Sequence, residues 1–175
     1  AGMLQRLSCQ GKTAHSSLPH LGQNAIAMLV DEAQALKLDP ELKKAIGFIR
    51  QKIGFETHGK SLGVQFEDAP SGALTCNLSM LDYRAPWLTW TVDIRYPVTM
   101  EGQTLIQTLE AQILEAGYEM ELLACRQPLY IPEDSPILQK LGKAYFRQML
   151  KPYKPIGIGG GTYAKSLPNI VAFGP

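Results

Sequence analysis

The segment GKTAHSSLP at positions 11–19 carries the side chain with the clearest chemical potential, the imidazole of His15. Pro19 and the neighbouring serines argue against a regular helix, so His15 is expected in a polar loop at the lip of a sheet. Such an imidazole can donate a hydrogen bond or a proton near neutral pH, but another group must generate the nucleophile. No clear nucleophile accompanies it. His15 is therefore either one part of a reaction centre or a solvated loop residue.

Arg95 is a second candidate, because it is expected on the polar face of a strand. In residues 90–96, apolar side chains alternate with Thr91, Asp93 and Arg95. A guanidinium held on a rigid strand can bind a carboxylate through two parallel hydrogen bonds. The same spacing allows Arg95 to pair with Asp93. The sequence leaves both interpretations open.

A glycine turn at Gly159, Gly160 and Gly161 is the third candidate. Consecutive glycines let a backbone approach a ligand closely and offer N–H donors to a carboxylate, although a simple tight turn would have the same sequence. With the following Thr-Tyr-Ala the run fits a loosened dinucleotide-binding pattern. The second strand and acidic residue of that fold do not follow it. Nucleotide binding is therefore not favoured.

The sequence predicts no metal ligands. Its three cysteines are widely separated and have no C-x-x-C spacing or nearby histidine, so we expect buried thiols and not ligands or disulfides. His20 follows His15 across a proline, which does not produce the helical H-E-x-x-H geometry of a zinc site. The cysteines are Cys9, Cys76 and Cys125.

The elements that must position these candidates follow from apolar periodicity. Helical spacing predicts helices over about 24–37, 40–53, 102–116 and 135–150, and alternation predicts strands over 3–10, 62–67, 74–80, 90–96 and 118–126. This order favours an α+β fold, an antiparallel sheet with helices on one face, of ferredoxin-like type. The change of pattern after Pro128 predicts two domains, 1–132 and 133–175.

Composition narrows the function classes. Seventeen basic and sixteen acidic residues give a net charge of +1, so the chain as a whole does not call for nucleic acid or an anionic membrane, and any basic patch must be local. No apolar run approaches the roughly 20 residues of a membrane span, and the first residues lack the apolar stretch of a signal peptide. We expect a soluble, cytoplasmic protein.

Three motifs together resemble one known family. They are GKTAH with GQNA at 11–15 and 22–25, VDIRYP at 92–97, and GGGTYA at 159–164, followed by residues 169–175. In this order they are similar to the zinc aminopeptidase, aminoacylase and carboxypeptidase family. The resemblance is strongest to its PepV-like dipeptidase branch, and it covers nearly the whole chain.

The resemblance implies specific roles. Family members have a catalytic domain with two zinc ions and an inserted α+β lid domain, and this chain resembles the lid, with residues 133–175 returning to the catalytic domain. By the same resemblance, His15 would stabilise the oxyanion formed when zinc-bound hydroxide attacks a peptide carbonyl. Arg95 would bind the free carboxylate of a dipeptide, helped by the backbone of Gly159, Gly160 and Gly161. Asn77 is carried over as a further substrate contact.

The departures from the family pattern matter equally. The metal-binding H-x-D element, the Glu-Glu pair and the final histidine of the family are absent from this sequence, so we expect the chain alone to be inactive and not to bind zinc stoichiometrically. The alternative is a standalone binding or dimerisation module, in which a sheet edge or helical face pairs with a partner such as a second copy. Its motifs would then be relics.

Overall fold

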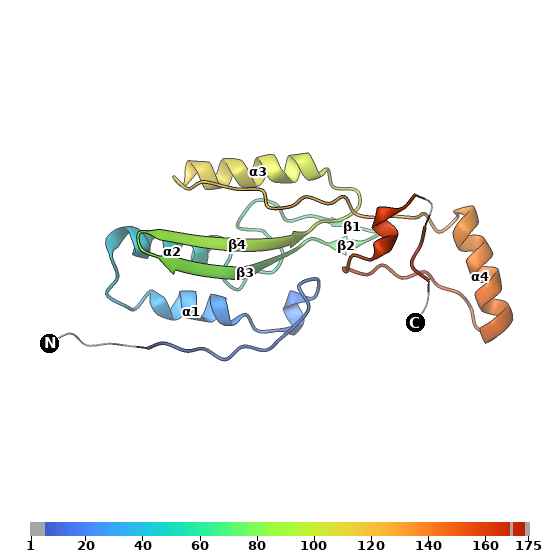
Figure 1. Ribbon diagram of the computed structural model, residues 1–175, viewed down its shortest axis with the longest axis horizontal. Coiled ribbons are helices and arrows are strands. Elements are labelled where there is room, and N and C mark those ends of the chain that lie inside the picture. The colour runs from blue at the N-terminus through green and yellow to red at the C-terminus, as the bar shows by residue number, and fades with distance from the viewer. Residues whose placement is uncertain (1–5, 169, 174–175) are drawn as a thin grey trace. The chain divides into compact units, whose positions relative to one another are not determined.

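The computed structural model describes residues 6–168 and 170–173. They fall into two compact units, of which the first ends at Cys125 and the second begins at Arg126. The first unit contains the helices α1, α2 and α3 and all four strands, and the second contains α4 (Figure 1). The sequence-based division into domains at residue 132 stays a prediction.

The helices of the first unit begin where short polar side chains cap them. Asn24 accepts hydrogen bonds from the second and third amides of α1 (Ala25–Ala33), and Asp39 does the same for α2 (Pro40–Lys52), whose first residue is a proline. Helix α3 (Gly102–Glu115) ends before Gly117, whose φ is +84°. Helix α1 is shorter than predicted, because the amides of residues 34–36 bond to carbonyls three residues earlier and tighten the chain into turns.

The main sheet is an antiparallel hairpin of β3 (Thr75–Arg84) and β4 (Trp87–Arg95). Its register pairs Asn77 with Asp93, and it shifts by one residue after Leu78 because Ser79 forms a bulge. Two short strands, β1 (Glu67–Asp68) and β2 (Gly72–Ala73), form a separate antiparallel pair. The predicted α+β class with an antiparallel sheet is confirmed.

Three predicted strands are wrong in the described residues. Residues 6–10 and 118–126 contain no strand, and only Glu67 of the predicted strand 62–67 is in one; residues 3–5 lie outside the described part. The alternation in 62–67 reflects burial without pairing, because Leu62 and Val64 are buried in a turn closed by a hydrogen bond from Val64 N to Gly59 O. In 118–126, Leu122 and Leu123 are exposed, so this segment has no buried face to hold it in a sheet.

One core holds the first unit together. Apolar side chains of all three helices meet the apolar face of the hairpin, so the polar face of the hairpin remains outside the core. Burial raises the pKa of the Cys76 thiol to about 12, which leaves it neutral and unreactive. The prediction of buried thiols is right for Cys76 and wrong for the exposed Cys125. The buried core residues are Val30, Ile46, Ile49, Ile53, Leu62, Val64, Leu74, Cys76, Leu78 and Leu105.

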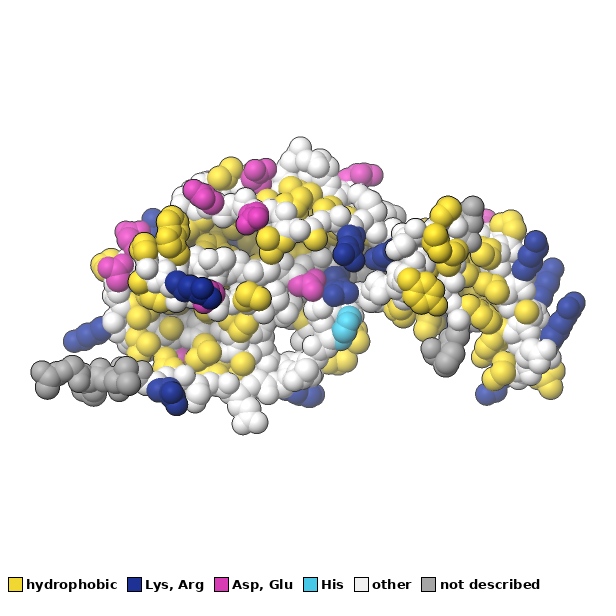
Figure 2. Space-filling model, in the orientation of Figure 1, with side chains coloured by type: hydrophobic (Ala, Val, Ile, Leu, Met, Phe, Trp, Pro, Cys, Tyr) yellow, Lys and Arg dark blue, Asp and Glu magenta, His cyan; other side chains and the backbone are white. Residues whose placement is uncertain are grey.

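The second unit is built around α4 (Pro136–Met149), which the sequence predicted at nearly these bounds. The ring of Tyr153 packs where a Cβ on Gly142 would lie, 2.6 Å from Cδ1 of that ring. Exposed basic side chains gather along the helix (Figure 2). A local basic patch therefore exists despite the balanced total charge. Its members on α4 are Lys140, Lys143 and Arg147.

A carboxylate joins the small β1–β2 hairpin to the segment before α3. Asp68 accepts hydrogen bonds from the backbone and hydroxyl groups of both Ser71 and Thr99. Desolvation acts to raise the pKa of Asp68, but these four hydrogen bonds outweigh it and lower that pKa to about 2. The ionised form of Asp68 is therefore stabilised by folding.

We predict that Asp68→Ala destabilises the chain at neutral pH, with a deficit that shrinks as pH falls. The pKa of Asp68 in the folded state is about 2 against an ordinary 3.8, so its contribution is present above about pH 4 and is lost as pH falls toward 2. Urea denaturation of both proteins at several pH values measures the gap. The neighbouring Glu67→Ala serves as control and should show no such gap. A gap that is constant from pH 5 to pH 2 would contradict the assignment.

Candidate functional site

The predicted site begins with a loop whose two ends touch. Lys12 and Gln23 exchange backbone hydrogen bonds of 3.0 and 2.9 Å, so residues 12–23 form a closed loop. Gly11 and Gly22 permit this closure. A Cβ on Gly11 would lie 2.3 Å from the Gln23 carbonyl oxygen, and one on Gly22 would lie 2.7 Å from the Lys12 carbonyl oxygen. We call residues 12–23 the histidine loop.

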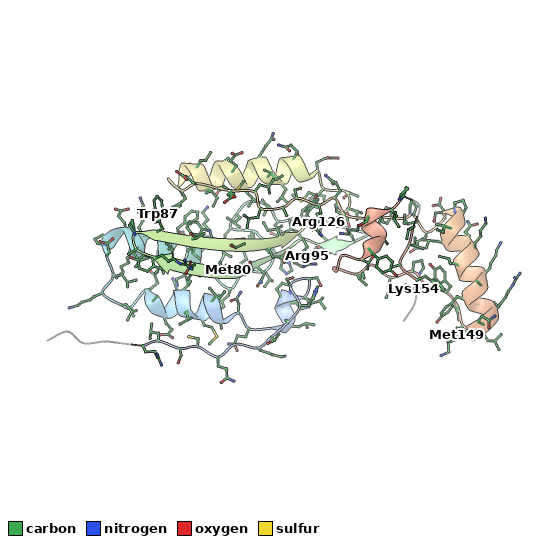
Figure 3. The ribbon with its side chains drawn as sticks, in the orientation of Figure 1. Met80, Trp87, Arg95, Arg126, Met149 and Lys154 are labelled. Atoms are coloured by element: carbon green, nitrogen blue, oxygen red, sulfur yellow. The ribbon has the colours of Figure 1, made fainter. Side chains whose placement is uncertain are left out.

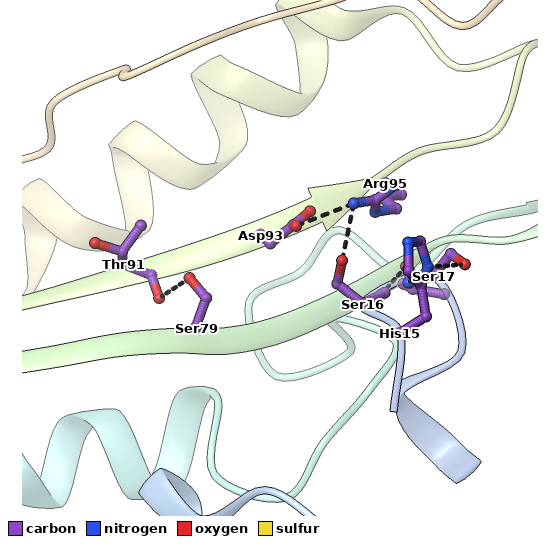
Figure 4. Close-up of polar contacts among 8 residues, drawn as sticks. His15, Ser16, Ser17, Ser79, Thr91, Asp93 and Arg95 are labelled. Carbon is purple, nitrogen blue, oxygen red and sulfur yellow. Dashed lines mark hydrogen bonds and ion pairs between the residues drawn. The ribbon is translucent and has the colours of Figure 1, made fainter. Parts of the chain in front are cut away.

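Ser16 attaches the histidine loop to the end of the hairpin by hydrogen bonds (Figure 4). Its hydroxyl oxygen accepts a 2.8 Å hydrogen bond from Nη2 of Arg95, and its carbonyl oxygen accepts a 3.3 Å bond from the Thr75 hydroxyl. Thr75 and Arg95 are cross-strand partners at one end of the hairpin. Trp87 lies at the other end, beside the turn (Figure 3). The loop is therefore attached to both strands through two oxygen atoms of one residue.

His15 is exposed, and its orientation is set within the loop. Its Nδ1 lies 2.7 Å from the Ser17 hydroxyl and 3.3 Å from the Ser17 backbone nitrogen. The His15 carbonyl oxygen accepts a 2.8 Å bond from the Leu18 amide, which closes a turn. The other ring nitrogen, Nε2, is on the far side of the ring from these partners.

Asn77 lies on the polar face of the hairpin and is held by the cap of α1. Nδ2 of Asn24 donates a 3.0 Å hydrogen bond to Oδ1 of Asn77 and a 2.7 Å bond to the Leu78 carbonyl oxygen. Because Oδ1 of Asn77 accepts this bond, its own amide nitrogen has the role of a donor. In the part of the chain that the structure describes, that nitrogen makes no hydrogen bond within the protein.

Arg95 pairs with Asp93, the second of the two alternatives that the sequence left open. Nη2 of Arg95 lies 3.3 Å from a carboxylate oxygen of Asp93, and both side chains are about one-third exposed, at 32% and 36%. An ion pair at this exposure contributes little to stability. The pairing orients the guanidinium on the polar face.

Three of the six predicted site residues lie at one end of one unit. His15, Asn77 and Arg95 are connected through Ser16, Asn24 and the cross-strand partner Asp93. The glycines belong to the second unit, where a Cβ on Gly160 would meet nothing within 4 Å, so packing does not require glycine at that position. Their role as substrate contacts stays a prediction.

Sequence reasoning missed the residues that support the site. Ser16 and Ser17 lie inside the GKTAHSSLP motif, but nothing in the motif distinguishes their roles. Asn24 was recognisable as a helix start, yet its contact with Asn77 joins positions 53 apart. Only the folded chain brings these groups together.

The described residues do not fit a metal centre. Among residues 6–168 and 170–173, no group of three or more histidine, cysteine, aspartate or glutamate side chains could hold a metal ion. Within the same ranges, no helix has the length and apolar character required to cross a membrane. The chemistry that the described site can supply is hydrogen-bond donation and carboxylate binding.

Comparison with known proteins gives a consistent result. The chain is 35% identical over 170 residues to "Putative dipeptidase YtjP" of Bacillus subtilis (strain 168). It is 32% identical over 169 residues to a protein of Staphylococcus haemolyticus (strain JCSC1435) that is also named a putative dipeptidase. These alignments cover 97% and 96% of this chain. No protein-family model matches it.

The alignments cover only 36% of either relative, so the chain spans about a third of the length of the curated relatives it matches. The chain is thus related to one segment of proteins that carry a dipeptidase name. This agrees with the dipeptidase part of the resemblance drawn from the motifs. The zinc ions and the PepV-like branch stay predictions.

We predict that Gly22→Ala opens the histidine loop and destabilises the first unit by about 1–3 kcal/mol, because the added Cβ must displace backbone atoms. Urea denaturation measures the loss of stability, and the NMR chemical shifts of the His15 ring report the change in loop conformation. Gly47→Ala is a matched control. Its Cβ would lie 3.8 Å from the nearest atom, inside α2, so it should stabilise by about 0.5–1 kcal/mol. Unchanged stability of Gly22→Ala would show that the loop is not closed in this way.

Proposed function

We propose that this chain is the lid portion of a longer, zinc-dependent dipeptidase of the PepV-like branch, which hydrolyses the peptide bond of dipeptides in the cytoplasm. The observation that carries the proposal is the shared anchoring of His15 and Arg95 through Ser16. One group is suited to an oxyanion and the other to a carboxylate. A dipeptide presents both features a few bonds apart. The similarity to proteins named as dipeptidases supports the same assignment.

In this proposal His15 is the catalytic residue of the chain. Nδ1 is occupied by Ser17, so Nε2 is the nitrogen that can donate to the oxygen of the scissile carbonyl as negative charge develops there. A donor fixed in place before the reaction stabilises that charge without reorganising. The exposed position of His15 lets it reach a substrate held by another part of the longer protein.

Arg95 and Asn77 would bind the substrate. The guanidinium of Arg95 lies on the polar face of the hairpin beside Ser16 and Asp93, and its planar shape suits two parallel hydrogen bonds to a carboxylate. The amide nitrogen of Asn77 is a neutral donor on the same polar face. Gly159, Gly160 and Gly161 stay proposed substrate contacts in the longer protein, through their backbone N–H groups.

The two zinc ions of this proposal do not fit the described residues and would be held by the rest of the longer polypeptide, the proposed catalytic domain. When bound there, they would supply the activated water. The contribution of this chain is confined to binding the dipeptide and stabilising its oxyanion. On its own it is expected to show no dipeptidase activity.

A binding or dimerisation module remains the second candidate, because one observation favours it. Among the described residues β3 and β4 pair only with each other, so the hairpin has outer edges that another chain could extend, for instance in a homodimer. Sedimentation of the chain over a range of concentrations tests this. The module is favoured if the chain dimerises and His15 variants of the longer protein stay fully active.

We predict that His15→Ala in the longer protein lowers kcat by about 10²- to 10³-fold with little change in KM, because the lost donor acts mainly in the transition state. Steady-state kinetics with a dipeptide measures both constants. His20→Ala, an exposed histidine in the same loop, is the matched control and should behave as the wild type. An unchanged kcat in His15→Ala would make His15 a bystander.

A further inference from the structure

The contacts of His15 with Ser17 distinguish its two ring nitrogens. Nδ1 faces two groups of one residue, the Ser17 hydroxyl at 2.7 Å and the Ser17 backbone nitrogen at 3.3 Å. A hydroxyl can donate or accept a hydrogen bond, whereas a backbone N–H can only donate. The backbone N–H therefore requires Nδ1 to be the acceptor, and the hydroxyl, at the shorter distance, strengthens the pairing by donating to the same atom.

This direction selects one tautomer of the neutral imidazole. If the proton were on Nδ1, it would face the Ser17 N–H, and two donors would oppose each other. With the proton on Nε2, the lone pair of Nδ1 accepts from the backbone N–H, and the hydroxyl can turn to donate to the same atom. The bond that one ring nitrogen makes thus sets the state of the other.

We propose that Ser17 is a positioning residue that keeps the proton of neutral His15 on Nε2 and holds the ring with that N–H directed outward. Its consequence for catalysis rests on the proposed function, because only an Nε2–H donor could contact the oxyanion. The tautomer itself is a property of this chain and needs neither zinc nor substrate. Ser17 acts through His15 and does not itself contact the substrate.

The adjacent Ser16 supplies a matched control. Its hydroxyl accepts from Arg95 and its carbonyl oxygen accepts from Thr75, and neither atom contacts the His15 ring. Ser16→Ala is the same change of side chain as Ser17→Ala. It removes the hydroxyl that accepts from Arg95 and leaves both partners of Nδ1 in place. A general loosening of the loop would affect both variants, whereas a positioning role affects only Ser17→Ala.

The experiment is ¹⁵N NMR of the ring nitrogens in the 175-residue chain, labelled at its three histidines, at a pH where the imidazoles are neutral. His15→Gln assigns the His15 signals. In the wild type we expect Nε2 protonated and Nδ1 unprotonated. Ser17→Ala keeps the backbone N–H but loses the hydroxyl at 2.7 Å, so it should increase the Nδ1-protonated share several-fold. Ser17→Thr should restore the wild-type ratio, and Ser16→Ala should retain it.

A wild type protonated mainly on Nδ1, or an unchanged ratio in Ser17→Ala, would overturn the positioning role. That result combined with a large kcat loss in His15→Ala would leave the proposed function standing. The opposite pair of results, a tautomer controlled by Ser17 and a fully active His15→Ala, would support the positioning role and contradict the proposed function. The two proposals can therefore fail separately.

Discussion

The hydrogen bond between Arg95 and Ser16 is the interaction on which the site depends. It joins positions 79 apart and attaches the histidine loop to the end of β4, with Thr75 adding a contact from β3. At the partial exposure of Arg95, such a bond contributes on the order of 1 kcal/mol. This is small beside the core but sufficient to favour one placement of a short loop. His15 and Arg95 therefore share a common anchor.

Rigid elements surround this anchor. The backbone bonds between Lys12 and Gln23 close the loop. The next residue, Asn24, caps α1 while it bonds to the side chain of Asn77 and to the carbonyl oxygen of Leu78 in β3. The loop is consequently held at both ends and in the middle. A loop fixed in this way by a packed core can present a donor with little loss of conformational freedom on binding, which is the condition for electrostatic stabilisation of a transition state.

Local signals predicted much of the fold, and three of the residues that they singled out lie at one end of the hairpin. Asp39-Pro40 predicted the start of α2, and alternation correctly placed Asp93 and Arg95 on one polar face. Alternation failed where burial occurs without strand pairing, at Leu62 and Val64, because periodicity reports which side chains are buried and not which backbone groups pair. The contacts of Ser16 and Asn24 could not be predicted, since they depend on how distant segments meet.

The most direct test of this account compares a dipeptide with its C-terminal amide, which lacks the free carboxylate, as substrates of the longer protein and its Arg95→Ala variant. If Arg95 binds that carboxylate, the wild type should prefer the dipeptide in kcat/KM by about 10- to 100-fold, the value of a hydrogen bond to a charged group. The variant should lose most of this preference. A preference that survives in Arg95→Ala would contradict the account.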